Sequence, residues 1–322
     1  MKLLIAGSGF IVHDWLTIAK DLKDTELEAI VTTARSEKVG QELATKYGIK
    51  HTYIDYDLAL AESKADTVYV AVPNFLHYEF TKKALLAGKN VICEKPFTLN
   101  LAEFEELKKI ALEKNLVLIE AITNIYLPNF KLIKEKLPEL GNIRIITMNY
   151  SQYSHRYDNF KKGIIEPVFD PEKGGGALLD LNVYNIHLLV ELFGLPKYVK
   201  YLANIQRGVD TSGILLLDYG DFKVSSIAAK DAGAPITSII EGDEETIVIN
   251  GAINSLPSFD IYQKYKKLNH FDVNDHPHRM YDEFVAFEKI IKQHDMDAVK
   301  DSLKHSEDVM KVIDSARKEF KQ

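Results

Sequence analysis

The first part of the chain alternates short apolar runs with segments of helical periodicity. The apolar runs lack polar alternation, which is typical of strands buried on both faces. They occupy residues 2–7, 27–33, 66–72, 90–93 and 116–121. Helical patterns lie between them, at residues 12–22, 37–48, 77–88 and 101–115. This order predicts a doubly wound α/β domain over residues 1–122, with a parallel sheet and helices on both faces.

The pattern changes after Tyr126. Longer strand-like segments follow, at residues 142–153, 198–206, 212–220, 222–230 and 236–250. A strongly apolar helix is expected at 177–193, and two more helices at 279–293 and 298–320. Together these segments predict an α+β second domain, residues 123–322, built on a large, mostly antiparallel open sheet.

The composition argues against a nucleic-acid-binding protein and against a membrane protein. The 322 residues include 40 Lys and Arg against 47 Asp and Glu, a net charge of −7 without a basic block. Nucleic-acid binding normally needs a concentrated positive surface, so we do not expect it. No apolar run approaches the length of a membrane span, and a single cysteine, Cys93, fits a reducing compartment. We expect a soluble cytoplasmic protein without a membrane partner.

A glycine turn follows the first predicted strand in the stretch "AGSGFIV". Glycines at this position let the backbone approach a pyrophosphate group, so Gly7, Gly9, Phe10 and Ile11 are predicted to contact a dinucleotide. Val12 stands where the dinucleotide-binding fingerprint has a small residue, and a plain strand–turn–helix connection would also explain the stretch. The placement on the first strand of a βαβ unit favours the cofactor interpretation.

The end of the second predicted strand indicates which cofactor binds. NAD-binding domains usually carry an acid there for the ribose 2′-hydroxyl. Here Thr33 ends the strand, Arg35 follows it, the first acid is Glu37, and Glu28 comes too early. A guanidinium and hydroxyl groups suit a 2′-phosphate, so we expect NADP(H) in preference to NAD(H). The alternative is that Arg35 is a solvated loop charge.

Two later strand ends carry further candidates. Pro73, Asn74 and His77 follow the strand at 66–72 and are predicted to line the cofactor site, although Asn74 could serve only as a helix cap.

Glu94 and Lys95 follow the strand at 90–93, before Pro96. The carboxyl end of this strand should share a sheet edge with the glycine turn, where ligands bind in open parallel sheets. We predict that Glu94 and Lys95 lie at the cofactor and that Lys95 assists proton transfer. The alternative is an exposed loop lysine.

The stretch "GGGALLDLNVYNIHLLVELFG" carries the other candidate catalytic groups. Its glycines permit close approach of a ligand or an irregular turn. In a regular helix, Asp180, Tyr184, His187 and Glu191 share one face. A carboxylate, a phenol and an imidazole can pass protons, whereas a solvated face is normally rich in Lys and Glu. The alternative is a buried helix whose polar groups bond to neighbouring backbone.

Tyr126, Arg156 and His187 are additional candidates for substrate binding. Arg156 lies in "SHRYDNFKKG", a segment that could line a pocket or form a surface loop. His276 and His278 have no third ligand at suitable spacing, so we expect a structural pair and no metal site.

Taken together, "GSGFI", "VPNFLH", "EKP" and "GGGALLDLNVYNIH" resemble the Gfo/Idh/MocA family of glucose–fructose oxidoreductase, inositol 2-dehydrogenase and their relatives. The resemblance runs along the whole chain. It implies a Rossmann domain followed by an α/β domain whose open sheet often mediates oligomerisation, here a homodimer or homotetramer. It also implies hydride transfer between a nicotinamide cofactor and a sugar, cyclic polyol or related diol, without a metal.

The resemblance also implies roles for individual residues. Lys95 is similar to the family's catalytic lysine and Asp180 to its helix aspartate. Tyr184 stands where many inositol dehydrogenases have a histidine, and here the chain resembles the glucose–fructose oxidoreductase and dimeric dihydrodiol dehydrogenase branch, in which a tyrosine is the proposed acid/base. His187 matches no required family position. Two other functions remain open: a glycosidase that oxidises its substrate transiently with bound NAD, and a non-catalytic cofactor-sensing regulator.

Overall fold

The computed structural model describes residues 1–318, which divide into two compact units. Unit 1 consists of Met1–Ala121 and Met280–Glu307, and unit 2 consists of Ile122–Arg279 and the segment that starts at Asp308. The last two residues of the helix expected at 298–320 lie outside the described residues.

Unit 1 contains a parallel six-stranded sheet in the order β3-β2-β1-β4-β5-β6. Its strands are β1 (Lys2–Ala6), β2 (Glu26–Val31), β3 (His51–Tyr53), β4 (Thr67–Val70), β5 (Asn90–Glu94) and β6 (Leu118–Ala121). The side chains of β4 are all buried, as its unbroken apolar run predicts. The predicted doubly wound sheet is therefore confirmed. Strand β3 was not predicted, because three residues are too few to show a periodicity.

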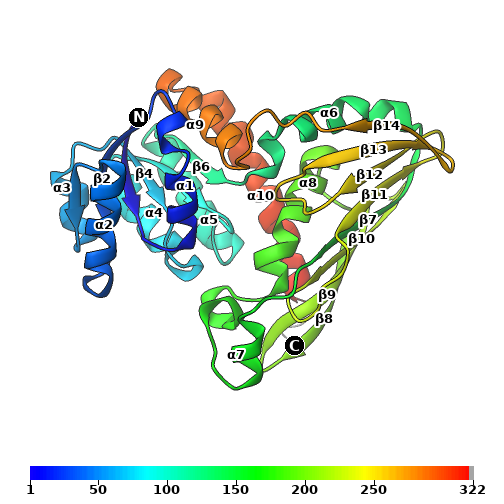
Figure 1. The fold of residues 1–322 in the computed structure, drawn as a ribbon, viewed down its shortest axis with the longest axis horizontal. Helices are drawn as coiled ribbons and strands as arrows, with labels where there is room; N and C mark the ends of the chain where they lie inside the picture. Colours follow the sequence, from blue (N-terminus) through cyan, green and yellow to red (C-terminus); the bar gives the residue numbers. More distant parts are fainter. Residues whose placement is uncertain (319–322) are drawn as a thin grey trace. The chain divides into compact units, whose positions relative to one another are not determined.

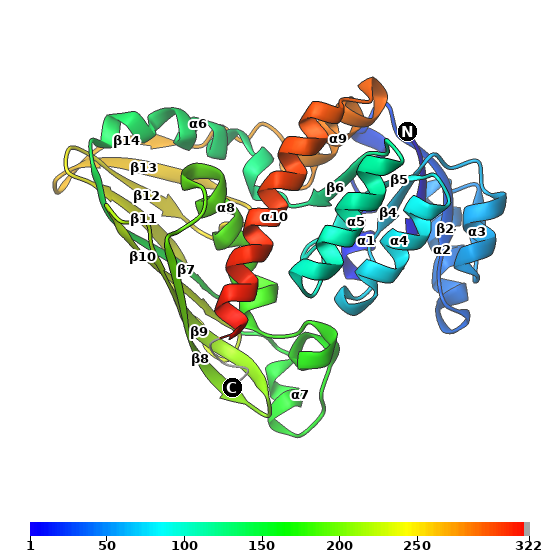
Figure 2. The ribbon, with the colours of Figure 1, turned by 180° about the vertical axis from the view of Figure 1, so that it is seen from behind.

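Helices cover both faces of this sheet. The helices between strands are α1 (Phe10–Leu16), α2 (Glu37–Tyr47), α3 (Tyr56–Glu62), α4 (His77–Leu86) and α5 (Leu101–Glu113). Helix α1 lies in front of the sheet in Figure 1, and α4 and α5 lie in front of it in the reverse view of Figure 2. The helix expected at 12–22 begins earlier and ends at Leu16, and a separate 3₁₀ turn follows at Ala19–Asp21.

The later helices α9 (Tyr281–Gln293) and α10 (Met296–Lys318) begin in unit 1. The Phe284 ring of α9 lies 5.1 Å from the ring of Trp15 and 5.2 Å from that of Tyr69. Glu288 accepts a hydrogen bond of 2.6 Å from Thr25. Aromatic packing thus joins residues far apart in sequence. The expected division into a cofactor domain (1–122) and a substrate domain (123–322) concerns function and stays a prediction.

Unit 2 contains an eight-stranded sheet in the order β14-β13-β12-β11-β7-β10-β9-β8. Only β7 and β10 pair in parallel; the other neighbours are antiparallel. The strands are β7 (Ile143–Ser151), β8 (Tyr198–Gln206), β9 (Val209–Asp218), β10 (Lys223–Ala229), β11 (Thr237–Gly242), β12 (Thr246–Asn250), β13 (Ser258–Gln263) and β14 (Lys266–Phe271). The predicted mostly antiparallel sheet is confirmed. Strands β13 and β14 were not predicted.

Three helices belong wholly to unit 2: α6 (Pro128–Lys136), α7 (Tyr157–Lys161) and α8 (Val183–Phe193). Helix α8 lies against one face of the sheet (Figures 1 and 2). Ile146 and Met148 of β7 point to that face and are buried, whereas Ile145 alternates with them and is exposed. In the described part of the chain, no helix covers the opposite face of the sheet, so apolar side chains remain exposed there.

Candidate functional site

The candidate residues of unit 1 gather at the carboxyl edge of the parallel sheet. Ala6 of β1 pairs in register with Val70 of β4, which pairs with Cys93 of β5. Neighbouring strands lie about 5 Å apart, so Ala6 and Cys93 are separated by about 10 Å. The glycine turn follows Ala6, and Lys95 comes two residues after Cys93. The structure therefore brings these two predicted features to one edge.

The glycine turn has a close-packed side and an open side. Gly7 has a φ of +121°, and a side chain on it would collide with the carbonyl of Ala71. Only glycine combines that conformation with so close an approach. A Cβ on Gly9 would meet nothing within 4 Å. Phe10 is exposed and Ile11 half-buried at the start of α1, while Val12 is buried in the core. The open side of the turn thus leaves room for a pyrophosphate group.

Arg35 lies in a 3₁₀ turn that follows β2. Its side chain is exposed, and no carboxylate within residues 1–318 lies at ion-pair distance from it. Thr33, also exposed, donates a hydrogen bond of 3.4 Å to Ser36. Glu28, by contrast, is buried and paired with Lys50 at 3.2 Å. A guanidinium without a protein counter-charge suits a phosphate ligand.

The loop that carries Lys95 is anchored on both sides. The Phe97 N–H donates to the Glu120 carboxylate at 3.0 Å, and Ser306 donates to the other Glu120 oxygen at 2.7 Å. The Pro96 carbonyl lies 2.8 Å from Nδ1 of His77. These contacts are buried, and buried hydrogen bonds are costly to break. Lys95 itself is half-buried, and its peptide bond to Pro96 is cis.

His77, predicted to contact a cofactor, is instead fully enclosed. Its Nε2 lies 2.9 Å from the Val72 carbonyl, so both ring nitrogens face backbone oxygens. Burial lowers the pKa of His77, although the two carbonyls act in the opposite direction. The ring therefore joins the end of β4 to the Lys95 loop.

The other candidates on this edge differ in exposure. Glu94 is buried and accepts a hydrogen bond of 2.5 Å from Tyr69. Pro73 is exposed and Asn74 half-buried at the start of a 3₁₀ turn. Pro73 and Asn74 are therefore the more accessible to a ligand.

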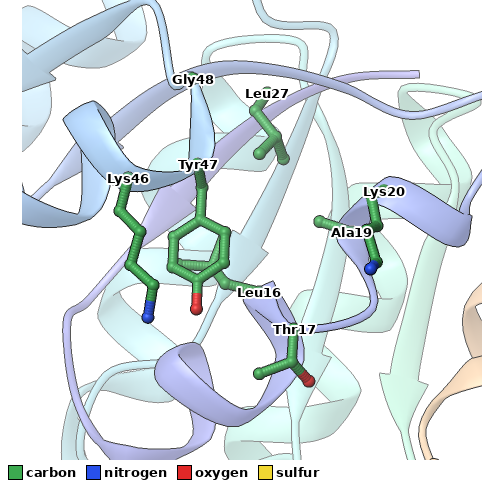
Figure 3. A pocket seen from close by; sticks show the side chains of 8 residues that line it. All are labelled: Leu16, Thr17, Ala19, Lys20, Leu27, Lys46, Tyr47 and Gly48. Atoms are coloured by element: carbon green, nitrogen blue, oxygen red, sulfur yellow. The ribbon is translucent and has the colours of Figure 1, made fainter.

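A cavity of about 630 Å³ lies elsewhere in unit 1 (Figure 3). It is lined by Leu16, Thr17, Ala19, Lys20, Leu27, Lys46, Tyr47 and Gly48. Leu27 lies near the start of β2, so the cavity is at the amino edge of the sheet and contains none of the predicted site residues.

In unit 2, the segment that carries Asp180 is a π-helical turn, Leu178–Asn182, which leads into α8. Such turns are frequent at functional sites. The side chain of Asp180 is 32% exposed, and it accepts a hydrogen bond of 2.8 Å from Lys230, whose side chain is only 2% exposed. Lys230 was not among the residues predicted from the sequence.

Two glycines before this turn, Gly175 and Gly176, pack against protein and not against a space for ligand. A side chain on Gly176, which has a φ of +115°, would collide with the Asp210 carboxylate. Asp210 accepts hydrogen bonds from the Leu178 N–H at 2.7 Å and from Tyr201 at 2.8 Å. Burial raises the pKa of Asp210 to about 6. Of the two interpretations left open for these glycines, the structure supports the irregular turn.

Tyr184 is buried to 7% exposure on α8, with its ring centroid 6.0 Å from that of Tyr150. Its backbone carbonyl accepts a hydrogen bond of 2.8 Å from Asn124. His187 is fully buried, whereas Glu191 forms an ion pair of 2.6 Å with Lys134. The four residues expected on one helix face therefore have unlike surroundings, because the π-helical turn changes the register and the sheet covers the middle of the helix.

The remaining candidates are spread over unit 2. Tyr126 is half-buried in a 3₁₀ turn, and Arg156 pairs with Glu166 at 3.2 Å. His276 accepts a hydrogen bond of 3.1 Å from the N–H of His278. Among residues 1–318, no cluster of three or more His, Cys, Asp or Glu could hold a metal ion. No helix in the same range is long and apolar enough to cross a membrane.

Two family models match the chain. The Gfo/Idh/MocA model, described as an oxidoreductase family with an NAD-binding Rossmann fold, matches residues 1–122. The Gfo/Idh/MocA C-terminal domain model matches residues 132–248.

Similar proteins extend the match to nearly the full length. The chain is 34% identical to scyllo-inositol 2-dehydrogenase (NADP(+)) IolU of Bacillus subtilis, over 99% of this chain and 97% of that protein. It is 26% identical to trans-1,2-dihydrobenzene-1,2-diol dehydrogenase of Mus musculus, over 82% of each. The fold matches the crystal structure of the 3-ketoreductase KijD10 from Actinomadura kijaniata with NADP and TDP-benzene. The TM-score is 0.86 at 21% identity, over 99% of this chain and 97% of that one.

Proposed function

Because the chain belongs to the Gfo/Idh/MocA family of NAD(P)-dependent oxidoreductases, we propose that it interconverts a secondary alcohol and a ketone on a cyclic polyol or sugar, with NADP(H) as the preferred cofactor. The similarity to an NADP-dependent scyllo-inositol dehydrogenase over nearly the whole chain supports a polyol substrate. One observation of the structure carries the proposal: the Lys95 loop is anchored by buried bonds at the sheet edge that also carries the open glycine turn.

The residues at the sheet edge are suited to bind the phosphate groups of NADP(H). The open side of Gly9 leaves space for the pyrophosphate, and the exposed Arg35 can pair with a 2′-phosphate. Pro73 and Asn74 are accessible at the same edge. A nicotinamide cofactor held by these residues would supply the hydride acceptor for the substrate carbon, or the hydride donor in the reverse direction. We assign His77 to positioning the Lys95 loop, since its ring nitrogens face backbone.

We propose that Tyr184 and Lys95 handle the substrate proton. In the oxidative direction the carbinol C–H bond breaks as a hydride leaves, and the hydroxyl proton passes to Tyr184. A phenol normally loses its proton only near pH 10, and a nearby lysine cation would favour the phenolate. Asp180 orients the substrate or Tyr184. Tyr126 and Arg156 remain candidates for substrate binding, whereas His187 is fully buried and is no longer one.

A substrate screen tests the proposal. Purified protein is incubated with NADP⁺ or NAD⁺ and a panel of inositols, sugars and diols, and cofactor reduction is followed by absorbance. Reduction of NADP⁺ by at least one polyol or sugar is expected. A parallel panel of glycosides, scored for released sugar without net cofactor reduction, identifies the glycosidase alternative. Tight cofactor binding without turnover in either panel would favour the regulator.

We also propose that the open sheet of unit 2 mediates formation of a homodimer or homotetramer. Leu202, Ile214 and Leu216 are exposed on β8 and β9. Leu202 lies opposite Ile214 in the strand pairing, so the two form part of one apolar surface. Such a surface on an isolated subunit commonly marks an interface. The cytoplasmic location stays a prediction.

A further inference from the structure

Lys230 places a positive charge in the interior of unit 2. It directly follows β10, and its side chain is 2% exposed. Its Nζ donates hydrogen bonds to the Asp180 carboxylate at 2.8 Å and to the Val168 carbonyl at 2.7 Å. The same nitrogen lies 4.7 Å from the ring centroid of Phe169. The ammonium is therefore enclosed by an anion, a carbonyl oxygen and an aromatic face.

Stability alone does not account for this arrangement. A buried ion pair pays a large desolvation cost, and replacing such a pair by apolar side chains is often neutral or stabilising. The first residue of β10, Lys223, offers a contrast, because it pairs with Asp218 at 3.0 Å and both side chains are about half exposed. A lysine as deeply buried as Lys230 is thus the unusual one of the two, and the acid that pairs with it is Asp180.

We propose that Lys230 is a positioning residue, which holds the Asp180 carboxylate in one orientation for the reaction. This inference rests on the proposed function, in which Asp180 orients the substrate or Tyr184. Lys230 does not itself touch the substrate, because its side chain is almost wholly enclosed.

The surroundings of Lys230 fix its position. Its backbone N–H donates to the Thr211 carbonyl at 2.8 Å, which ties the residue to β9. Its side chain then spans from the sheet to the π-helical turn of Asp180 and to the 3₁₀ turn Pro167–Phe169. The carboxylate is 32% exposed, so one side of it remains accessible while the lysine holds the other. This is the arrangement expected of a second residue that orients a reacting group.

The first test compares Lys230→Met with Lys223→Met, the same substitution at an exposed position at the other end of β10. We expect Lys230→Met to lower kcat by about 10- to 100-fold, because Asp180 loses the charged hydrogen bond that holds its carboxylate. The dissociation constant for NADP(H) should stay within about twofold, and Lys223→Met should behave like wild type. Lys230→Arg, which keeps the charge, should recover part of kcat. Wild-type kcat in Lys230→Met would overturn the proposal.

The second test asks whether Lys230 acts through Asp180. In an Asp180→Asn background, adding Lys230→Met should cause little further loss of kcat, because the carboxylate to be positioned is already absent. If the two substitutions lower kcat by factors that multiply in the double variant, Lys230 and Asp180 act independently and the proposal is overturned.

The third test does not depend on knowing the substrate. Crystal structures of wild type and Lys230→Met should show a changed or disordered Asp180 side chain in the variant, and an unchanged one would contradict the proposal. If Lys230→Met does not fold, Lys230→Gln takes its place in all three tests. Should the wild type turn over no polyol or sugar, the proposed function fails, while these structures still decide whether Lys230 positions Asp180.

Discussion

Nδ1 of His77 lies 2.8 Å from the carbonyl oxygen of Pro96, the residue directly after Lys95. Because the other ring nitrogen faces the Val72 carbonyl, one imidazole joins two strand ends at the same sheet edge. We predict that His77→Leu lowers the free energy of unfolding by about 1–3 kcal/mol, the usual cost of leaving a buried polar group unpaired. The measurement is urea denaturation.

The same variant should also lower kcat, because the Lys95 loop loses an anchor. His51→Leu, at an exposed position on the edge strand β3, is the control and should change neither quantity appreciably. If His77→Leu has the same free energy of unfolding and the same kcat as wild type, His77 does not anchor the Lys95 loop.

We expect Arg35 to make the protein bind NADPH more tightly than NADH. A charged hydrogen bond contributes about 1.5–3 kcal/mol, so Arg35→Asp should weaken NADPH binding by about 10- to 100-fold and NADH binding much less. Energy transfer to bound NADPH from Trp15, the only tryptophan of the chain, provides the measurement. Lys38→Asp, another exposed charge near the end of β2, is the control. Equal losses for both cofactors would show that Arg35 is a solvated loop charge.

Asp210 should make stability depend on pH. Burial raises its pKa from 3.8 to about 6 in the folded protein. Between these values the folded protein holds a proton that the unfolded chain has released, so the free energy of unfolding falls as pH rises. The free energy of unfolding of wild type, relative to that of Asp210→Asn, should therefore fall by up to about 3 kcal/mol between pH 4 and pH 6.

Urea denaturation across this pH range measures the difference between wild type and Asp210→Asn. Asp297→Asn, at a side chain that is 92% exposed, should show no such trend. A wild-type-minus-variant difference that is flat with pH, or that rises with it, would contradict the assigned direction of the shift.

The open sheet should govern the oligomeric state. Leu202→Glu together with Ile214→Glu places charges in the exposed apolar surface of β8 and β9 and should convert the oligomer to monomer. Light scattering after size-exclusion chromatography measures the mass. Leu86→Glu, at an exposed leucine of α4, is the control and should leave the oligomer intact. A monomeric wild type, or an oligomeric double variant, would exclude this interface.

The sequence allowed the sheets to be predicted where strands are long or wholly apolar. Strand β8 occupies the predicted residues, 198–206, and β4 follows its apolar run closely. Strand β14 was missed because its sequence, "KKLNHF", is largely polar and exposed on the edge of the sheet. Helix α9 was predicted, but its packing on Trp15 was not, because no local pattern encodes a contact between residues so far apart.

The candidate site could be predicted only in part for a similar reason. Lys95 and Asp180 stand in recognisable stretches, whereas Lys230 ends an ordinary strand, "KVSSIAAK", and a lysine there is normally solvated. Its burial depends on Phe169 and Asp180, both distant in sequence. The π-helical turn was also missed, because its residues have the apolar spacing of a regular α-helix.

The most direct test of the central claim is turnover in Lys95→Met, Tyr184→Phe and the double variant, with NADP⁺ and the best polyol from the screen. Removing a general acid or base typically costs about 10²–10⁴-fold. We expect kcat to fall by that amount in each single variant and little further in the double variant, since the two groups act as a unit. NADPH binding should stay close to wild type, and Tyr198→Phe, at an exposed tyrosine, should stay fully active. Near-wild-type kcat in either Lys95→Met or Tyr184→Phe would contradict the account.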